Sequence, residues 1–192
     1  MTQNRPHPDG AFPAQPRWHL RLLGDVVLTD ARGTVHRLPG RTTTALLARL
    51  ALAPDRAHAR EALVDLLWPG VALDVGRNRL RQALSTLKTL LDGSGAPADG
   101  VLQAERLWLR LQPGSVGCDA LHFEQALRAG ALPEAAALYR GDLLPGFYDD
   151  WVQDERQRLQ ALADQLPTHL PSHLPAHLPA HLPAHRPPLP TA

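Results

Sequence analysis

The pattern of apolar and polar positions is most regular between residues 73 and 92, where it predicts one long amphipathic helix. Four leucines recur there at helical spacing and form a single stripe: Leu80, Leu84, Leu87 and Leu91. Amides and hydroxyls lie opposite the stripe, flanked by cations: Asn78, Gln82, Ser85 and Thr89, with Arg79, Arg81 and Lys88. No acid lies between Asp74 and Asp92, whereas a solvated helix usually mixes both signs of charge. A surface helix that is basic by chance is the alternative.

Strand-like patterns lie on both sides of the helical region. Apolar and polar residues alternate from Trp18, and turn signals at Gly24–Asp25 and Asp30–Gly33 divide residues 18–38 into three runs. These runs predict a small antiparallel meander. After the long helix, Val101–Gln103 and Leu107–Leu111 predict a hairpin, with Leu107, Leu109 and Leu111 on one side and Trp108 and Arg110 on the other.

Two shorter helices are predicted between the meander and the long helix. Arg41–Ala53 has helical periodicity, and one threonine of Thr42–Thr44 is expected to cap it. Arg60–Trp68 follows, and Asp74 is the expected cap of the long helix. A small antiparallel sheet, three helices and a C-terminal hairpin form an α+β winged helix-turn-helix. In that fold the third helix enters the major groove of DNA and the hairpin is the wing.

The charge of the chain is unevenly distributed. Residues 17–91 hold twelve cations against six acids, a net charge of +6, whereas residues 119–164 hold nine acids against four arginines, a net charge of −5. A basic segment followed by an acidic one indicates two modules with different partners. Residues 1–17 lack the apolar core of a signal peptide, and no apolar run approaches the ~20 residues of a membrane span. We therefore expect a cytoplasmic, nucleoid-associated protein with no membrane partner.

The candidate DNA contacts follow from side-chain chemistry and position. Amides and guanidinium groups recognise base edges, so the base-reading set is the outer face of the long helix: Asn78, Arg79, Arg81, Gln82 and Ser85. Cations and hydroxyls near helix ends and on the wing are candidate phosphate contacts: Arg41, Arg60, Lys88, Thr89, Arg106 and Arg110. Arg77 is placed nearer the buried edge of the helix. The alternatives are solvated arginines and, for Arg110, packing along Trp108.

Several motifs resemble one bacterial family. REALVDLLWP at 60–69 and RNRLRQALSTLK at 77–88 resemble the DNA-binding domain of the Streptomyces antibiotic regulatory proteins (SARPs), an OmpR-like winged helix. CDALHFEQAL at 118–127, AALYRGDLLPGF at 136–147 and DWVQDERQRL at 150–159 resemble the start of the bacterial transcriptional activator domain (BTAD). In that family this helical, tetratricopeptide-like (TPR-like) module follows the winged helix. The resemblance covers roughly residues 18–165.

The resemblance divides the chain into four parts. Residues 1–16 are expected to be a disordered arm, 17–112 the winged helix, 113–166 a partial BTAD and 167–192 a disordered tail. The tail is a His-Leu-Pro-Ala repeat, and proline at every fourth residue forbids a helix. It stands where the family usually has further helices. An apolar strip on the helix through residues 150–166 is therefore expected to be bare and to promote self-association.

Neither a metal site nor a catalytic site is expected. Neighbouring histidines of the tail start ~12 Å apart in an extended polyproline helix, too far for one tetrahedral zinc site: His169, His173, His177, His181 and His185. The single Cys118 is expected to be a small residue entering a helix that starts near Asp119. The sequence has no GxxxxGK loop, GxSxG, HExxH or strand-linked GxGxxG motif, so no enzymatic activity and no cofactor are expected.

The sequence thus predicts a sequence-specific DNA-binding transcriptional regulator whose expected partner is double-stranded DNA. The resemblance implies an activator that binds direct repeats near promoters and contacts RNA polymerase, through the loop Pro69–Asp74, with the BTAD assisting homodimer formation. The alternatives are a protein-interaction module, or a truncated remnant that binds promoters without activating them.

Overall fold

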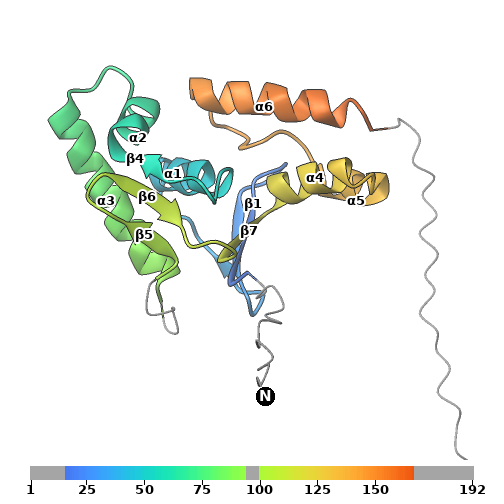
Figure 1. Ribbon diagram of the computed structural model, residues 1–192, viewed down its shortest axis with the longest axis horizontal. Coiled ribbons are helices and arrows are strands. Elements are labelled where there is room, and N and C mark those ends of the chain that lie inside the picture. The colour runs from blue at the N-terminus through green and yellow to red at the C-terminus, as the bar shows by residue number, and fades with distance from the viewer. Residues whose placement is uncertain (1–15, 94–99, 167–192) are drawn as a thin grey trace, which may run out of the picture.

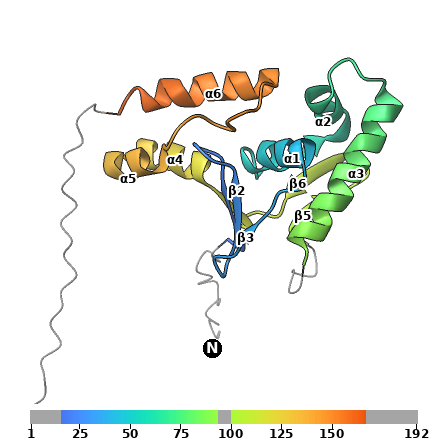
Figure 2. The same ribbon diagram turned by 180° about the vertical axis from the view of Figure 1, so that it is seen from behind.

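The computed structural model describes residues 16–93 and 100–166, which form two small sheets and six helices (Figure 1 and Figure 2). This mixed architecture agrees with a winged helix followed by a helical segment. The predicted arm, apart from its last residue, and the predicted tail with its five histidines lie outside the described residues.

The first sheet has the strand order β3-β2-β1-β7. β1 (Trp18–Arg21), β2 (Val27–Asp30) and β3 (Val35–His36) are antiparallel neighbours, which confirms the predicted meander. β7 (Val116–Cys118) returns after the three following helices and pairs with β1 in parallel, in a register that places Leu20 beside Cys118. The sequence did not predict β7, because all three of its residues are buried and a run this short has no alternating pattern.

The three predicted helices are present, but side chains do not cap them. α1 (Arg41–Ala51), α2 (Arg60–Leu67) and α3 (Leu73–Leu91) pack on one another. The threonine cap of α1 is wrong: Gly40 occupies the N-cap at φ +82°, and the Thr44 hydroxyl donates to its carbonyl at 3.0 Å. The cap at Asp74 is also wrong, since Ala72 is the N-cap and Asp74 lies in the first turn of α3.

The predicted hairpin forms the second sheet together with a strand that the sequence did not predict. β5 (Leu102–Ala104) and β6 (Trp108–Leu111) are antiparallel, and β4 (His58–Ala59), just before α2, pairs with the other edge of β6. Leu107 was expected on the same side as Leu109 and Leu111, but unlike those two residues it is not buried. It precedes β6 at the tip of the hairpin and is 73% exposed.

Three helices complete the described chain: α4 (Asp119–Arg128), α5 (Leu132–Leu138) and α6 (Asp150–Ala163). α4 begins at Asp119 as predicted. The Asp119 carboxylate accepts the backbone N–H groups of Leu22 and Leu23 at 2.8 and 3.0 Å, which fastens α4 to the end of β1. Burial raises the pKa of this carboxyl group, and the two backbone donors act in the opposite direction.

The expected bare strip on α6 is wrong for the described residues. Trp151 is 7% exposed and Leu159 is 1% exposed, and Leu162 packs against the same core. α6 spans the molecule above α1 and α4 (Figure 1). The Arg158 guanidinium donates to the buried Glu124 carboxylate of α4 at 2.6 Å. The apolar side of α6 is thus buried in a core that residues of both modules share. We had expected only further helices to bury it.

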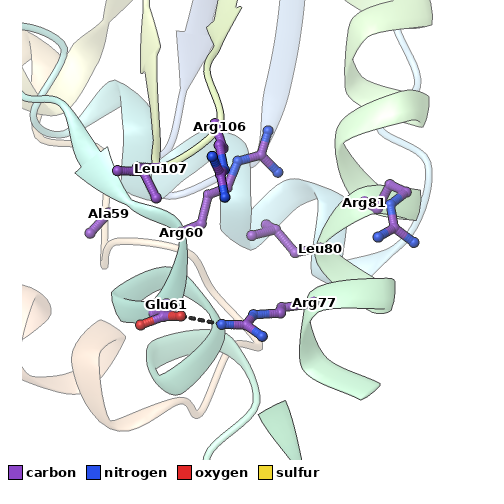
Figure 3. Close-up of a pocket in the computed structure, with 8 residues that line it drawn as sticks. All are labelled: Ala59, Arg60, Glu61, Arg77, Leu80, Arg81, Arg106 and Leu107. Atoms are coloured by element: carbon purple, nitrogen blue, oxygen red, sulfur yellow. Dashed lines mark hydrogen bonds and ion pairs between the residues drawn. The ribbon is translucent and has the colours of Figure 1, made fainter. Parts of the chain in front are cut away.

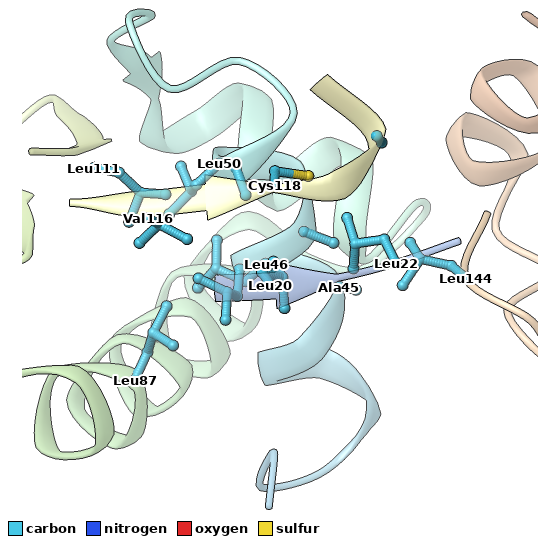
Figure 4. Close-up of a cluster of buried hydrophobic side chains, with 14 of the residues drawn as sticks. Leu20, Leu22, Ala45, Leu46, Leu50, Leu87, Leu111, Val116, Cys118 and Leu144 are labelled. Atoms are coloured by element: carbon cyan, nitrogen blue, oxygen red, sulfur yellow. The ribbon is translucent and has the colours of Figure 1, made fainter. Parts of the chain in front are cut away.

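One continuous apolar core joins the two modules. Figure 4 shows side chains from β1, α1, α3, β7 and the segment before α6 meeting between the sheet and the helices: Leu20, Leu22, Leu46, Leu50, Leu87, Cys118 and Leu144. Cys118 is the last residue of β7 and is 1% exposed. Burial, followed by the neighbouring Asp119, raises the pKa of its thiol to about 12. The thiol is therefore a core group.

Candidate nucleic-acid interface

All five predicted base-reading residues are exposed on α3. They are Asn78, Arg79, Arg81, Gln82 and Ser85. The opposite face of α3 is buried through Gly76, Leu80, Ala83, Leu84, Leu87 and Leu91, so packing fixes the direction in which the outer face points. On that face an Arg81 guanidinium N–H donates to Asn78 Oδ1 at 2.7 Å, which holds the guanidinium beside an amide one turn away. This pair leaves further donors of both side chains to face a ligand.

A cavity of about 580 Å³ separates one flank of α3 from the wing (Figure 3). Four arginines line it, from α2, α3 and the wing: Arg60, Arg77, Arg81 and Arg106. Leu107 lies at its edge, and Glu61 is its one acid and forms an ion pair with Arg77. The lining therefore has a formal charge of about +3, which favours a polyanion such as a nucleic-acid backbone.

Arg60 fixes the tip of the wing against α2. Its Nε donates to the Glu105 carbonyl at 2.8 Å, and its backbone N–H donates to the Leu107 carbonyl at 3.0 Å. The wing and α2 are thereby held as one unit around the cavity, while the terminal nitrogens of the guanidinium make no hydrogen bond within the described residues. The expected phosphate contact at Arg60 thus lies on an element that also positions Arg106.

The remaining predicted phosphate contacts lie in different surroundings. Lys88 is exposed on α3, and the exposed Thr89 donates its hydroxyl proton to the Ser85 carbonyl at 3.0 Å. Arg110 donates to Gln103 Oε1 at 2.6 Å and lies 5.3 Å from the centre of the Trp108 ring. This is the packing along Trp108 that the sequence offered as its alternative.

Arg41 contacts the segment that leads into α6. Its guanidinium donates to the Gly146 carbonyl at 2.7 Å and to the Asp149 carboxylate at 3.0 Å, and it lies 4.4 Å from the centre of the Phe147 ring. Three partners from one segment surround this cation. We therefore leave Arg41 out of the interface proposed below.

Sequence reasoning missed two residues of the cavity. Arg77 was placed nearer the buried edge of α3, but its side chain is 52% exposed and forms an ion pair with Glu61 in the cavity lining (Figure 3). Leu107 was grouped with Leu109 and Leu111 on one side of the wing and was not named as a candidate contact. The end of the strand pattern at Ala104–Arg106 is the signal that could have identified Leu107 as a tip residue.

The described residues contain no cluster of three or more His, Cys, Asp or Glu side chains that could hold a metal ion. None of the described helices is both long enough and apolar enough to cross a membrane.

The fold agrees with a winged helix followed by a helical segment, and a cationic cavity lies beside its third helix. No known protein family and no curated protein matches the chain in sequence. Among solved structures, EmbR of Mycobacterium tuberculosis, determined in complex with a low-affinity phosphopeptide, matches it with a TM-score of 0.55 and 26% identity. The match covers 78% of this chain and 41% of EmbR, so the chain spans less than half the length of that protein.

EmbR is a SARP-family regulator with a winged helix and a BTAD, and this likeness confirms the resemblance to SARP-type regulators. EmbR is a transcriptional regulator and does not belong to an enzyme family.

Proposed function

We propose that this protein is a sequence-specific DNA-binding regulator that activates transcription, with a winged helix at about residues 17–112 and a partial BTAD at about 113–166. The observation that carries the proposal is the position of the wing. It lies beside the polar outer face of α3, across a cavity with four arginines. A recognition helix in the major groove and a wing on the adjacent backbone need this arrangement.

In this proposal the outer face of α3 reads base edges through Asn78, Arg81, Gln82 and Ser85. Arg60, Lys88 and Arg106 contact phosphates, and Arg77 adds to the positive potential of the cavity. Thr89 joins them when its hydroxyl proton turns from the Ser85 carbonyl to a phosphate oxygen. Arg110 supports the wing through Trp108 and Gln103.

Binding should depend strongly on salt. If the chain contacts about four to six phosphates, the logarithm of affinity against the logarithm of salt concentration should have a slope of roughly −4 to −5. Fluorescence anisotropy with a labelled duplex measures this slope directly. A slope near zero would remove the DNA-binding proposal.

Base reading and backbone contact are separable by mutation. Gln82→Ala should cost about 1–3 kcal/mol on the preferred duplex and less on random DNA, because its amide carries sequence information. Arg106→Ala should weaken both duplexes equally. Arg128→Ala is the matched control, since it removes one exposed arginine from α4, at the far end of the molecule from α3 (Figure 1). Equal losses for Gln82→Ala on both duplexes would show that this face does not read bases.

Activation is proposed to use residues 69–74 as a contact for RNA polymerase, and the helical module to assist a homodimer. These residues are the loop between α2 and α3 together with the first two residues of α3. Leu73 supports this role for the loop, because it is an apolar side chain left 40% exposed at the start of α3. Leu73→Asp should retain DNA affinity and lower transcription from a promoter carrying the preferred site. Unchanged transcription would favour the alternative of a protein that binds promoters without this contact.

A further inference from the structure

A second cavity lies on the flank of α3 that faces away from the wing. Its volume is about 400 Å³, and it lies between α3, the first turn of α1 and the end of α2. Its lining is made of hydrogen-bonding side chains with a single charge: Thr42, Thr43, Trp68, Arg79, Gln82 and Thr86, with Ala83. No acid lines it, in contrast to the cavity beside the wing, where Glu61 pairs with Arg77.

Thr43 shows that this cavity is prepared for a polar ligand. The residue is only 6% exposed, yet its hydroxyl makes no hydrogen bond within the part of the chain that the structure describes. The hydroxyl oxygen is not sealed in the core, and it remains accessible from the cavity that the residue lines. The neighbouring Thr44, by contrast, donates its hydroxyl proton to the Gly40 carbonyl at 3.0 Å. The Thr43 hydroxyl is thus left for a group that enters the cavity.

The first turn of α1 adds donors at the same place. No side chain caps this helix, and its first turn contains no acid, so the backbone N–H groups next to Thr42 and Thr43 are free of a capping partner. Arg79 supplies the positive charge, and it forms no ion pair within the described residues. Hydroxyls, uncapped N–H groups and one guanidinium together are the donor set that binds a phosphate.

The dimensions of DNA explain why α3 needs such donors on both flanks. The major groove is about 12 Å wide, and an α-helix with its side chains is about 10–12 Å across. A helix that lies in the groove with its outer face toward the bases therefore has a sugar-phosphate backbone against each flank. The flank facing the wing meets one strand through Arg60 and Arg106.

We infer that the cavity lined by Thr42, Thr43 and Arg79 binds a phosphodiester of the opposite DNA strand. This inference rests on the proposed function, and it reassigns Arg79 from base reading to backbone contact. α3 is then held in the groove from both sides, and the specific reading is left to Asn78, Arg81, Gln82 and Ser85.

Phosphate-ethylation interference tests the assignment strand by strand. The probe is a duplex selected from random DNA by the full chain, with each strand ethylated and end-labelled in turn. With the wild-type chain, ethylation should interfere at positions on both strands. Arg79→Ala should remove the interference at a phosphate of one strand, and Arg106→Ala should remove it at a phosphate of the other strand. If Arg79→Ala leaves the pattern unchanged, or if both variants change the same strand, the inference is wrong.

Affinity measurements distinguish the contribution of the Arg79 charge from that of the Thr43 hydroxyl. Arg79→Ala should lower affinity about tenfold on selected and random duplexes alike, the fold-change for one lost charge-assisted bond. It should also reduce the magnitude of the salt slope by about 0.9. Thr43→Val, which keeps the shape of the side chain, should lower affinity on both duplexes without changing the slope. A loss confined to the selected duplex for Arg79→Ala would return this residue to base reading and overturn the inference.

The control and the wild type distinguish the two levels of failure. Arg128→Ala should match the wild type in affinity and in ethylation pattern, since it removes an arginine remote from α3. If the wild type selects no sequence and shows no salt-dependent binding, the proposed function itself fails. If the wild type binds as expected and Arg79→Ala behaves like Arg128→Ala, only the second phosphate site fails.

Discussion

Gly76 of α3 lies directly against Val64 of α2, and its replacement tests how tightly the two helices pack. A Cβ placed on Gly76 would lie 2.3 Å from Cγ1 of Val64, a side chain on α2 that is only 1% exposed. Valine cannot rotate away without leaving its preferred rotamer in a helix. Gly76→Ala therefore forces the two helices apart and shifts Arg60 relative to α3.

The magnitude follows from two opposing effects. Overpacking a well-packed site costs about 1–3 kcal/mol, and the short distance here favours the upper end of this range. Alanine in place of glycine within a helix contributes about 1 kcal/mol in the other direction. The free energy of unfolding should thus fall by about 2 kcal/mol, which urea denaturation followed by circular dichroism measures.

Two further variants make this prediction specific. Val64→Ala removes the atom that clashes, so Gly76→Ala combined with Val64→Ala should lose about 1–2 kcal/mol less than the sum of the single variants. Gly93→Ala is the control, because its added Cβ would meet only the Leu90 carbonyl oxygen, at 4.0 Å. If Gly76→Ala instead raised the stability by about 1 kcal/mol, helix propensity alone would act there and the close packing of α2 on α3 would be refuted.

Three further perturbations follow from the packing of single side chains. Burial raises the pKa of the Cys118 thiol to about 12, so in the folded chain it should resist iodoacetamide at pH 8 and react only in urea. Rapid labelling without urea would contradict its place in the core. Burial lowers the pKa of His58 below its ordinary value, so the unfolded chain binds the extra proton and stability should fall as pH drops from 7.5 through about 6.5. In the His58→Gln variant, the urea midpoint should change less over this pH range. If the variant showed the same pH dependence as the wild type, His58 would not be its cause. Arg41→Met should lower the urea midpoint by removing the contacts to Gly146 and Asp149, and Arg32→Met, on an exposed turn, should leave it unchanged.

The periodic parts of the fold could be predicted from the sequence. The leucine stripe of α3 fixed both its buried side and its outer face, because a helix of 19 residues repeats the pattern several times. The meander and the wing hairpin could also be predicted, because turn residues separate their apolar runs. The short strands β4 and β7 could not be predicted, since two or three residues hold no periodicity and their partners are distant in sequence.

The sequence could predict which residues of α3 are exposed at the candidate site. It could not predict the two cavities beside this helix. Helical spacing identified the exposed residues of α3, but it could not show which flank faces the wing and which faces α1. That division depends on tertiary packing, and it separates Arg77 and Arg81 on one side from Arg79 on the other. The engagement of Arg41 by Asp149 depends on residues 108 positions apart, beyond any local pattern.

The burial of the apolar side of α6 is one feature that the sequence predicted wrongly, because it depends on tertiary packing. The sequence left Trp151 and Leu159 without visible partners, because the family resemblance suggested that later helices would cover them. In the structure both side chains are buried in the common apolar core. The Arg158 guanidinium adds an ion pair to the buried Glu124.

The measurement that tests the central claim most directly is selection of bound duplexes from random DNA by the full chain, in parallel with Gln82→Ala and Arg128→Ala. If the outer face of α3 reads bases, the wild type and Arg128→Ala should select the same short motif. Gln82→Ala should select that motif with one or two positions relaxed. A wild-type chain that enriches no motif, or a Gln82→Ala variant that enriches the identical one, would contradict this account of how α3 recognises DNA.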